Sequence, residues 1–134
     1  MTTRCGVGLA LLVVLALARP AAAGHGWPTL VLTIDADSLQ QLTRQGRTVV
    51  AVDVRPPDAF AAGRLPGARS MPLTTFTVRQ RELPDGALVV LYGADSADEA
   101  AAAFRYLRSA GRTNVMVLEG GFAAWRAGGF EVER

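Results

Sequence analysis

Two clusters of residues in the 134-residue sequence have types and positions that could carry chemistry. The first is the segment Gly93-Ala94-Asp95-Ser96-Ala97-Asp98, which follows the apolar run 87–92. Ser96 is the only hydroxyl in this segment, and a serine needs a nearby base to become a nucleophile. The only histidine of the chain is His25, so we expect Ser96 to hydrogen-bond the loop backbone rather than to react.

The second cluster is Asp53 and Arg55 at the end of the β-branched run 48–54, with Arg64 further along the chain. Asp53 could act as an acid or base, but a buried carboxylate must be paired or hydrogen-bonded. We therefore expect Asp53 to pair with Arg55 or to accept backbone N–H groups. Asp53, Arg55, Arg64 and Glu99 are the candidate ligand or partner contacts around the loop.

Other kinds of chemistry lack the residues that they require. All basic residues are arginines, so no lysine can form a Schiff base. One histidine without partner ligands does not make a metal site, and we expect no metal and no cofactor.

The first residues have the layout of a secretory signal peptide. Arg4 precedes an uncharged apolar run, 6–18, and the small residues Ala21 and Ala23 suit cleavage before Gly24. The run is shorter than the roughly 20 residues of a spanning helix. The sequence therefore predicts a signal peptide over 1–23 and an exported domain, periplasmic or secreted, over 24–134. The alternative is an uncleaved membrane anchor.

Cleavage would change the composition of the protein. Arg4 and Arg19 leave with the signal, so 12 of the 14 basic residues remain against 12 acidic ones, and Cys5 leaves as well. A neutral domain has no basic footprint for nucleic acid. A domain without cysteine has no disulfide, thiol chemistry or cysteine metal site. We expect neither nucleic acid nor, after cleavage, a membrane as partner.

The rest of the chain alternates strand and helix patterns. Apolar runs predict strands at 30–34, 48–54, 69–73, 87–92 and 115–118. Capping residues and apolar spacing predict helices between Asp35 and Gly46 and at 56–63, 74–82, 98–110 and 122–127. The spacing of Phe122 and Trp125 indicates core packing rather than a shelf for a ligand. Alternating strands and helices predict one α/β domain with a mainly parallel sheet.

Four stretches in this order resemble the rhodanese (sulfurtransferase) family. They are Val52-Asp53-Val54-Arg55, Gly63-Arg64-Leu65-Pro66-Gly67-Ala68, Val89-Val90-Leu91-Tyr92 before a loop and a long helix, and Leu118-Glu119-Gly120-Gly121-Phe122 with Trp125 and Gly129. The resemblance implies a single rhodanese-like domain with a mainly parallel central sheet of about five strands flanked by helices.

The sequence departs from the family at the loop. In active members of the family that this sequence resembles, a nucleophilic cysteine directly follows the strand that corresponds to Val89 to Tyr92. The backbone N–H groups of the loop that begins there hold an anionic sulfur. Gly93 stands at that position. A cation that the family often has near the loop's end corresponds to about Asp98. The resemblance therefore implies a degenerate loop, Gly93 to Asp98, with no catalytic residue.

The charges at the loop disfavour a bound anion. Asp95, Asp98 and Glu99 lie where the next helix begins, and one carboxylate about 5 Å from an anion repels it by roughly 3 kcal/mol at an effective dielectric near 20. The helix dipole returns typically ~0.3–1 kcal/mol. The carboxylates therefore look like built-in replacements for the ligand, although Arg55 and Arg64 could offset them by pointing into the mouth.

We expect a non-enzymatic exported module that binds an unknown protein partner through the face around Gly93 to Glu99. Loops at the carboxyl ends of strands are where sheets of this class usually meet their ligands. One alternative is a protein that binds a small anion such as thiosulfate, sulfite or phosphate. Another is a sulfur-transfer accessory protein that uses an external thiol.

Overall fold

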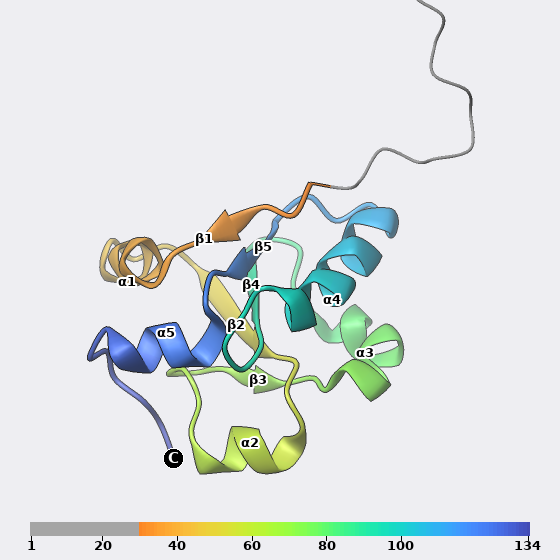
Figure 1. The fold of residues 1–134 in the computed structure, drawn as a ribbon. Helices are drawn as coiled ribbons and strands as arrows, with labels where there is room; N and C mark the ends of the chain where they lie inside the picture. Colours follow the sequence, from red (N-terminus) through yellow and green to blue (C-terminus); the bar gives the residue numbers. More distant parts are fainter. Residues whose placement is uncertain (1–29) are drawn as a thin grey trace, which may run out of the picture.

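The computed structural model describes residues 30–134, and they form one α/β domain (Figure 1). All strands pair in parallel in a five-stranded sheet of order β1-β5-β4-β2-β3. The strands are β1 (Thr33–Ile34), β2 (Val49–Asp53), β3 (Arg69–Ser70), β4 (Leu88–Tyr92) and β5 (Val115–Leu118). The predicted α/β class and five-stranded parallel sheet are confirmed.

Strand β4 lies at the centre because its side chains are apolar on both faces. Four consecutive residues, Val89 to Tyr92, are completely buried. Side chains alternate along a strand, so Val89 and Leu91 join one core cluster while Val90 and Tyr92 join the other. The continuous apolar run in the sequence thus reflects burial on both faces, as expected of a parallel sheet.

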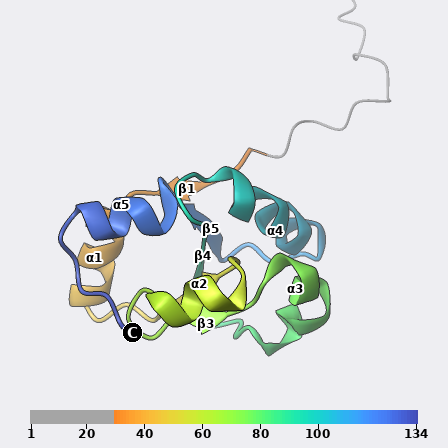
Figure 2. The ribbon, with the colours of Figure 1, turned by 60° about the horizontal axis from the view of Figure 1, so that its bottom comes forward.

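Helices cover the two faces of the sheet. They are α1 (Ala36–Arg44), α2 (Pro57–Ala62), α3 (Leu73–Arg79) with a 3₁₀ turn (Gln80–Glu82), α4 (Asp98–Ser109) and α5 (Gly121–Ala127). Leu39 of α1 and Trp125 of α5 pack on one face, and Phe76 of α3 and Phe104 of α4 pack on the other. Helix α2 directly follows β2 and lies in front of β4 in Figure 2, and its residues Ala59 and Ala62 line one pocket with Ala94 of the loop after β4.

Three elements differ from their sequence-based predictions. The predicted strand 30–34 is reduced to β1, which pairs only with β5, and Leu30 is 79% exposed. The predicted strand 69–73 is reduced to β3. The predicted polar helix 74–82 begins at Leu73, after Pro72, and buries Phe76 in the core.

The predicted signal peptide, 1–23, and His25 lie outside the described residues. Within residues 30–134, no helix is long and apolar enough to cross a membrane.

Candidate functional site

The loop between β4 and α4 is fixed by backbone hydrogen bonds to the start of α5. The N–H of Phe122 donates to the carbonyl of Gly93 at 2.9 Å, and the N–H of Ala123 donates to the carbonyl of Ala94 at 2.8 Å. The close approach requires glycine at 121, where φ is +57° and a Cβ would lie 2.6 Å from the Gly93 oxygen. The loop is thus held in place mainly by a neighbouring element, with one hydrogen bond of its own from the Asp98 N–H to Ser96 Oγ.

Gly93 has no room for a side chain. A Cβ built on it would lie 2.8 Å from Glu99 Cβ and 2.9 Å from Glu99 Oε2. Both distances are shorter than carbon and oxygen atoms in contact normally allow. The side chain of Glu99, in the first turn of α4, therefore occupies the space that a side chain at 93 would need, and a cysteine could enter only if the loop or the helix shifted.

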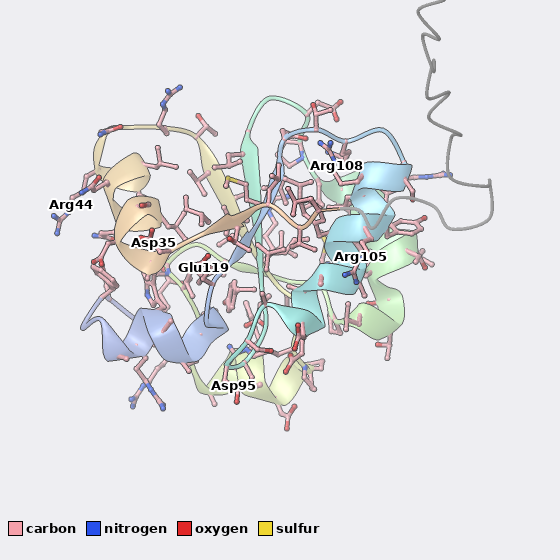
Figure 3. All side chains as sticks on the ribbon, turned by 45° about the horizontal axis from the view of Figure 1, so that its top comes forward. Asp35, Arg44, Asp95, Arg105, Arg108 and Glu119 are labelled. Carbon is pink, nitrogen blue, oxygen red and sulfur yellow. The ribbon has the colours of Figure 1, made fainter. Side chains whose placement is uncertain are left out.

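Within residues 30–134, the hydroxyl of Ser96 is hydrogen-bonded to the loop backbone and to no side chain. Ser96 Oγ accepts the N–H of Asp98 at 3.3 Å. Within residues 30–134, no hydrogen-bond acceptor is assigned to the N–H groups of residues 94–97. Asp95 and Asp98 are exposed at this edge of the domain, where Figure 3 shows Asp95 well apart from Arg105 and Arg108 of α4.

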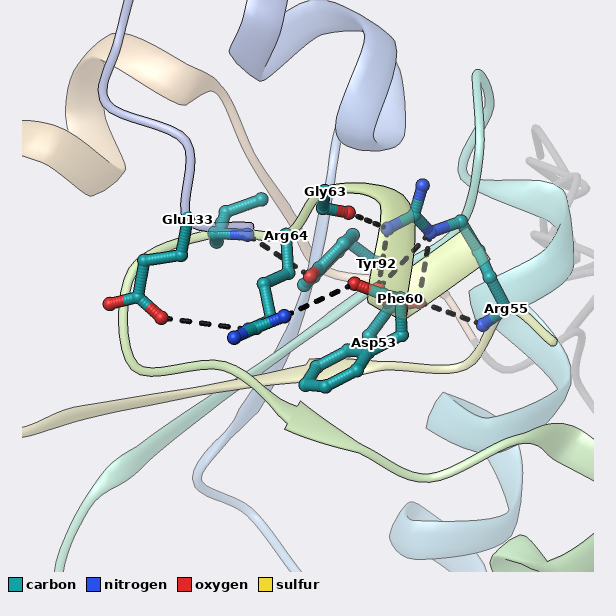
Figure 4. A network of polar contacts seen from close by, with 8 residues as sticks. Asp53, Arg55, Phe60, Gly63, Arg64, Tyr92 and Glu133 are labelled. Carbon is teal, nitrogen blue, oxygen red and sulfur yellow. Dashed lines mark hydrogen bonds and ion pairs between the residues drawn. The ribbon is translucent and has the colours of Figure 1, made fainter. Parts of the chain in front are cut away.

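Asp53 and Arg55 form a buried ion pair next to the loop (Figure 4). Asp53 is completely buried, and its carboxylate accepts the Arg55 backbone N–H at 2.9 Å, Nε–H at 3.0 and 3.1 Å and Nη2–H at 2.6 Å. Nη2 also donates to the carbonyl of Gly63 at 2.6 Å. Burial alone would lower the pKa of Arg55, but the hydrogen bonds and charge of Asp53 raise it above its ordinary value. The expected pairing of Asp53 and Arg55 is present, and it explains how this carboxylate tolerates burial.

Tyr92, the last residue of β4, is unsuited to act as a base. Its hydroxyl oxygen accepts the N–H of Leu65 at 3.2 Å. Burial is the main cause that raises the pKa of Tyr92 above its ordinary value, and the negative charge of Asp53 raises it further. The phenol therefore stays neutral at physiological pH and serves as a buried link between β4 and the turn at Leu65.

Of the two arginines considered for the mouth of the loop, only Arg55 faces it. A pocket of about 370 Å³ is lined by Arg55 of β2's end and Ala94 of the loop. Arg64 instead pairs with Glu133, with Nε 3.6 Å from Oε2, and stacks over the ring of Phe60 at 4.7 Å. Arg64 lies beside Glu133 because the two residues form an antiparallel bridge, which joins segments that are distant in the sequence.

Two pocket residues were missed by sequence reasoning. Phe122 does pack against the core that contains Trp125, but it is only half-buried and also lines the pocket, beneath the Arg55 guanidinium at 4.3 Å. Arg126 lines the same pocket from the exposed side of α5. Because Arg126 follows Phe122 by four residues, the two side chains lie on one helix face. This spacing could have predicted that they line one site, but Phe122 was assigned to the core alone.

The described residues offer no metal centre. Within residues 30–134, no three His, Cys, Asp or Glu side chains lie close enough to hold a metal ion.

The sequence matches the rhodanese-like domain family over residues 35–128. The chain belongs to this family. It is 33% identical to a sulfurtransferase of Allochromatium vinosum over 77% of this chain and 95% of that protein. It is 40% identical to the thiosulfate sulfurtransferase GlpE of Pseudomonas putida over 63% of this chain and 76% of that protein.

An uncharacterised Synechocystis protein, slr1261, is 39% identical over 73% of this chain, which spans only 54% of that protein's length. Solved structures share the fold. The Alr3790 protein of Anabaena sp. superposes with a TM-score of 0.69 at 32% identity, covering 75% of this chain and 81% of that one. A rhodanese-related protein of Thermoplasma volcanium also gives 0.69, at 22% identity over 76% and 97% of the two chains. The predicted membership of the rhodanese-like family is confirmed.

Proposed function

We propose that this chain is a rhodanese-like domain without sulfurtransferase activity that binds a protein partner through the face formed by Gly93 to Glu99. The observation that carries the proposal is the contact between Gly93 and Glu99, because the glycine offers no thiol and the glutamate fills the space of one. Relatives named sulfurtransferases share the family, so the proposal concerns this chain and not its relatives.

The carboxylate of Glu99 supports the loss of anion binding in the loop. Its Oε2 lies 2.9 Å from the point that the first side-chain atom of residue 93 would occupy. An anion held at this point would meet a like charge at contact distance, which costs more than a helix dipole returns. Glu99 thus acts as a built-in anion of the loop.

The exposed face of the loop is acidic. Asp95, Asp98 and Glu99 are all exposed, and within the described part of the chain none of their carboxylates forms an ion pair. Complementary charge steers association and fixes register. The partner we expect therefore presents basic residues to this face.

The first experiment tests turnover. The full chain and its Cys5→Ser variant are assayed with thiosulfate and cyanide, with and without added glutathione or dithiothreitol, beside the thiosulfate sulfurtransferase GlpE of Pseudomonas putida as positive control. We expect no turnover above the uncatalysed rate. Turnover by the Cys5→Ser variant would contradict the proposal, and turnover only with an added thiol would establish the external-thiol alternative in its place.

The second experiment tests the binding face. Cross-linking in the compartment where the protein resides identifies a partner, and its affinity is then measured with the double variant Asp95→Ala/Asp98→Ala. We expect weaker binding, mainly through a slower association rate. The control is Asp37→Ala/Asp85→Ala, which removes the same charge from exposed positions of α1 and of the turn before β4. Equal affinity of both double variants would contradict this placement of the binding face.

Export is part of the same proposal. The charged start, the apolar run 6–18 and the alanines before Gly24 support it. Mass spectrometry of the protein isolated from the exported fraction should give a chain that begins at Gly24. A protein retained inside the cell with residues 1–23 attached would exclude export.

A further inference from the structure

A second feature at the carboxyl edge of the sheet lies beside the loop and shares only Ala94 with it. The pocket of about 370 Å³ opens between α2 and α5. Its lining residues include Arg55, Ala59, Gly63, Ala94, Phe122 and Arg126. The volume is within the range of sites for small molecules.

Arg55 presents an unused donor to this pocket. Its side chain is 8% exposed, and its Nε and Nη2 atoms are taken up by Asp53 and Gly63. Nη1 makes no hydrogen bond within residues 30–134, and Figure 4 shows it on the side of the guanidinium away from Asp53. Among the described residues no fully buried side-chain nitrogen lacks a partner, so Nη1 is reached by solvent, and Arg55 is one of the residues that line the pocket. A guanidinium held from one side by Asp53 is pre-organised to donate from the other.

Asp53 neutralises the charge of Arg55, so the net positive charge of the pocket comes from Arg126. It is exposed, and within the described residues it has no ion-pair partner. Both guanidinium groups lie near the ring of Phe122, with that of Arg55 4.3 Å and that of Arg126 5.9 Å from the ring centre. The rest of the wall consists largely of small apolar side chains, such as Ala59 and Ala94.

We propose that this pocket binds a small organic carboxylate, with the carboxylate between Arg55 and Arg126 and its apolar part against Phe122 and Ala59. Planar guanidinium groups match carboxylate oxygens in geometry and charge. The aromatic and alanine walls favour a ligand with an apolar group over a bare inorganic ion. The pocket shares Ala94 with the proposed protein-binding face, but the acidic residues of that face, Asp95, Asp98 and Glu99, do not line it, so different variants test the two proposals.

The test is an NMR titration of the full chain with benzoate, propionate and sulfate across the millimolar range. We expect saturable shifts at the amides of Ala59, Gly63, Phe122 and Ala123, with benzoate binding more tightly than propionate and propionate more tightly than sulfate. Absence of saturable shifts at these amides, or an affinity for sulfate equal to or above that for benzoate, would overturn the proposal.

Two variants and a control locate the site. Arg126→Ala should weaken benzoate binding about tenfold, the effect of losing one charge-assisted hydrogen bond. Ala59→Glu places a carboxylate of the chain itself in the pocket and should abolish binding, with circular dichroism to show that the variant is folded. Arg105→Ala removes an exposed arginine on α4 and should leave the affinity unchanged. Equal benzoate affinity in Arg126→Ala and the unchanged protein would also overturn the proposal, and this outcome would leave the proposed function of the loop untouched.

Discussion

At the scale of single residues, two contacts lie at the carboxyl ends of β2 and β4: the ion pair of Asp53 with Arg55, and the close approach of the Glu99 side chain to Gly93. The pairing of Asp53 with Arg55 could be predicted, because a carboxylate at the end of a buried strand needs a partner and an arginine lies two residues away. The contact between Glu99 and Gly93 could not be predicted as a distance. The distance between these two residues depends on how closely α4 lies to the end of β4, and the packing of α4 on the sheet determines this.

The buried ion pair gives the first prediction. Asp53→Ala leaves the Arg55 guanidinium without the carboxylate that now takes two of its nitrogens, and removal of one partner of a buried pair costs about 3–5 kcal/mol of unfolding free energy. Urea denaturation measures this loss. Asp85→Ala breaks a pair with Arg112 in which the aspartate side chain is 97% exposed, and it should change stability little. Similar losses in the two variants would contradict the role assigned to Asp53.

The crowding at Gly93 gives the second prediction. Gly93→Ala should lower the unfolding free energy by about 1–3 kcal/mol, as overpacking does. Because Glu99 Cβ itself is 2.8 Å from the added atom, Glu99→Gly should relieve the strain more than Glu99→Ala, which keeps that carbon. A double-mutant cycle should show a coupling of about 1 kcal/mol or more for Gly93→Ala with Glu99→Gly. Additive effects in the cycle would show that Glu99 does not occupy the space beside Gly93.

At the scale of elements, the long buried strands and the capped helices were predictable, and the edge elements were not. Strands β2, β4 and β5 have continuous apolar sequences that only a two-sided core accommodates. The apolar segment 30–34 has the same composition, but only Thr33 and Ile34 find a neighbour in β5. Strand length at a sheet edge is decided by the partner, which local sequence does not reveal.

The link between α5 and the loop gives the third prediction. Gly121→Ala forces a side chain into a φ of +57° and toward the Gly93 oxygen, so the two hydrogen bonds from Phe122 and Ala123 should break. We expect a loss of about 1–3 kcal/mol in unfolding free energy and faster hydrogen exchange at both amides. Gly86→Ala has open space around the added carbon and should be neutral or stabilising. Unchanged exchange at Phe122 and Ala123 in Gly121→Ala would refute the link.

The start of α1 gives the fourth prediction. The amide and the hydroxyl of Ser38 both donate to Asp35, and these hydrogen bonds lower its pKa below the ordinary value of 3.8. The charged form is therefore favoured by folding, so its contribution is complete above that value and is lost as pH falls through the lowered pKa. Asp35→Ala should lower the melting temperature at pH 7 and make a smaller difference at pH 2. Asp37→Ala, without such a bond, is the control, and an equal effect at both pH values would contradict the cap.

At the scale of the whole molecule, functional groups converge on one edge. The loop after β4, the end of β2 and the start of α5 meet there because every strand runs in the same direction. The sequence predicted this convergence from the parallel sheet. It did not predict that the C-terminal segment returns to the same edge, since the bridge between Arg64 and Glu133 joins residues far apart in the chain.

The returning segment gives the last prediction. Phe130 stacks on Trp125 with ring centres 4.8 Å apart, Trp125 Nε1–H donates to the carbonyl of Glu131 at 2.7 Å, and Arg64 and Glu133 exchange backbone hydrogen bonds of 3.0 and 2.9 Å. A chain that stops after Gly129 loses all of these contacts and uncovers Trp125, which should cost about 2–4 kcal/mol of unfolding free energy.

Urea denaturation measures the cost of this truncation, and deletion of the exposed Arg134 alone is the matched control. Hydrogen exchange at the Arg64 amide should accelerate in the truncated chain and stay slow in the control. Val132 packs closely against Gly63, since a Cβ built on Gly63 would lie only 3.3 Å from Val132 Cγ1. Gly63 lines the pocket between α2 and α5, so the C-terminal segment also supports the wall of this pocket. The truncation should therefore weaken benzoate binding as well as the fold. Retention of full stability after truncation would mean that the sheet and its helices hold this edge without the C-terminal segment.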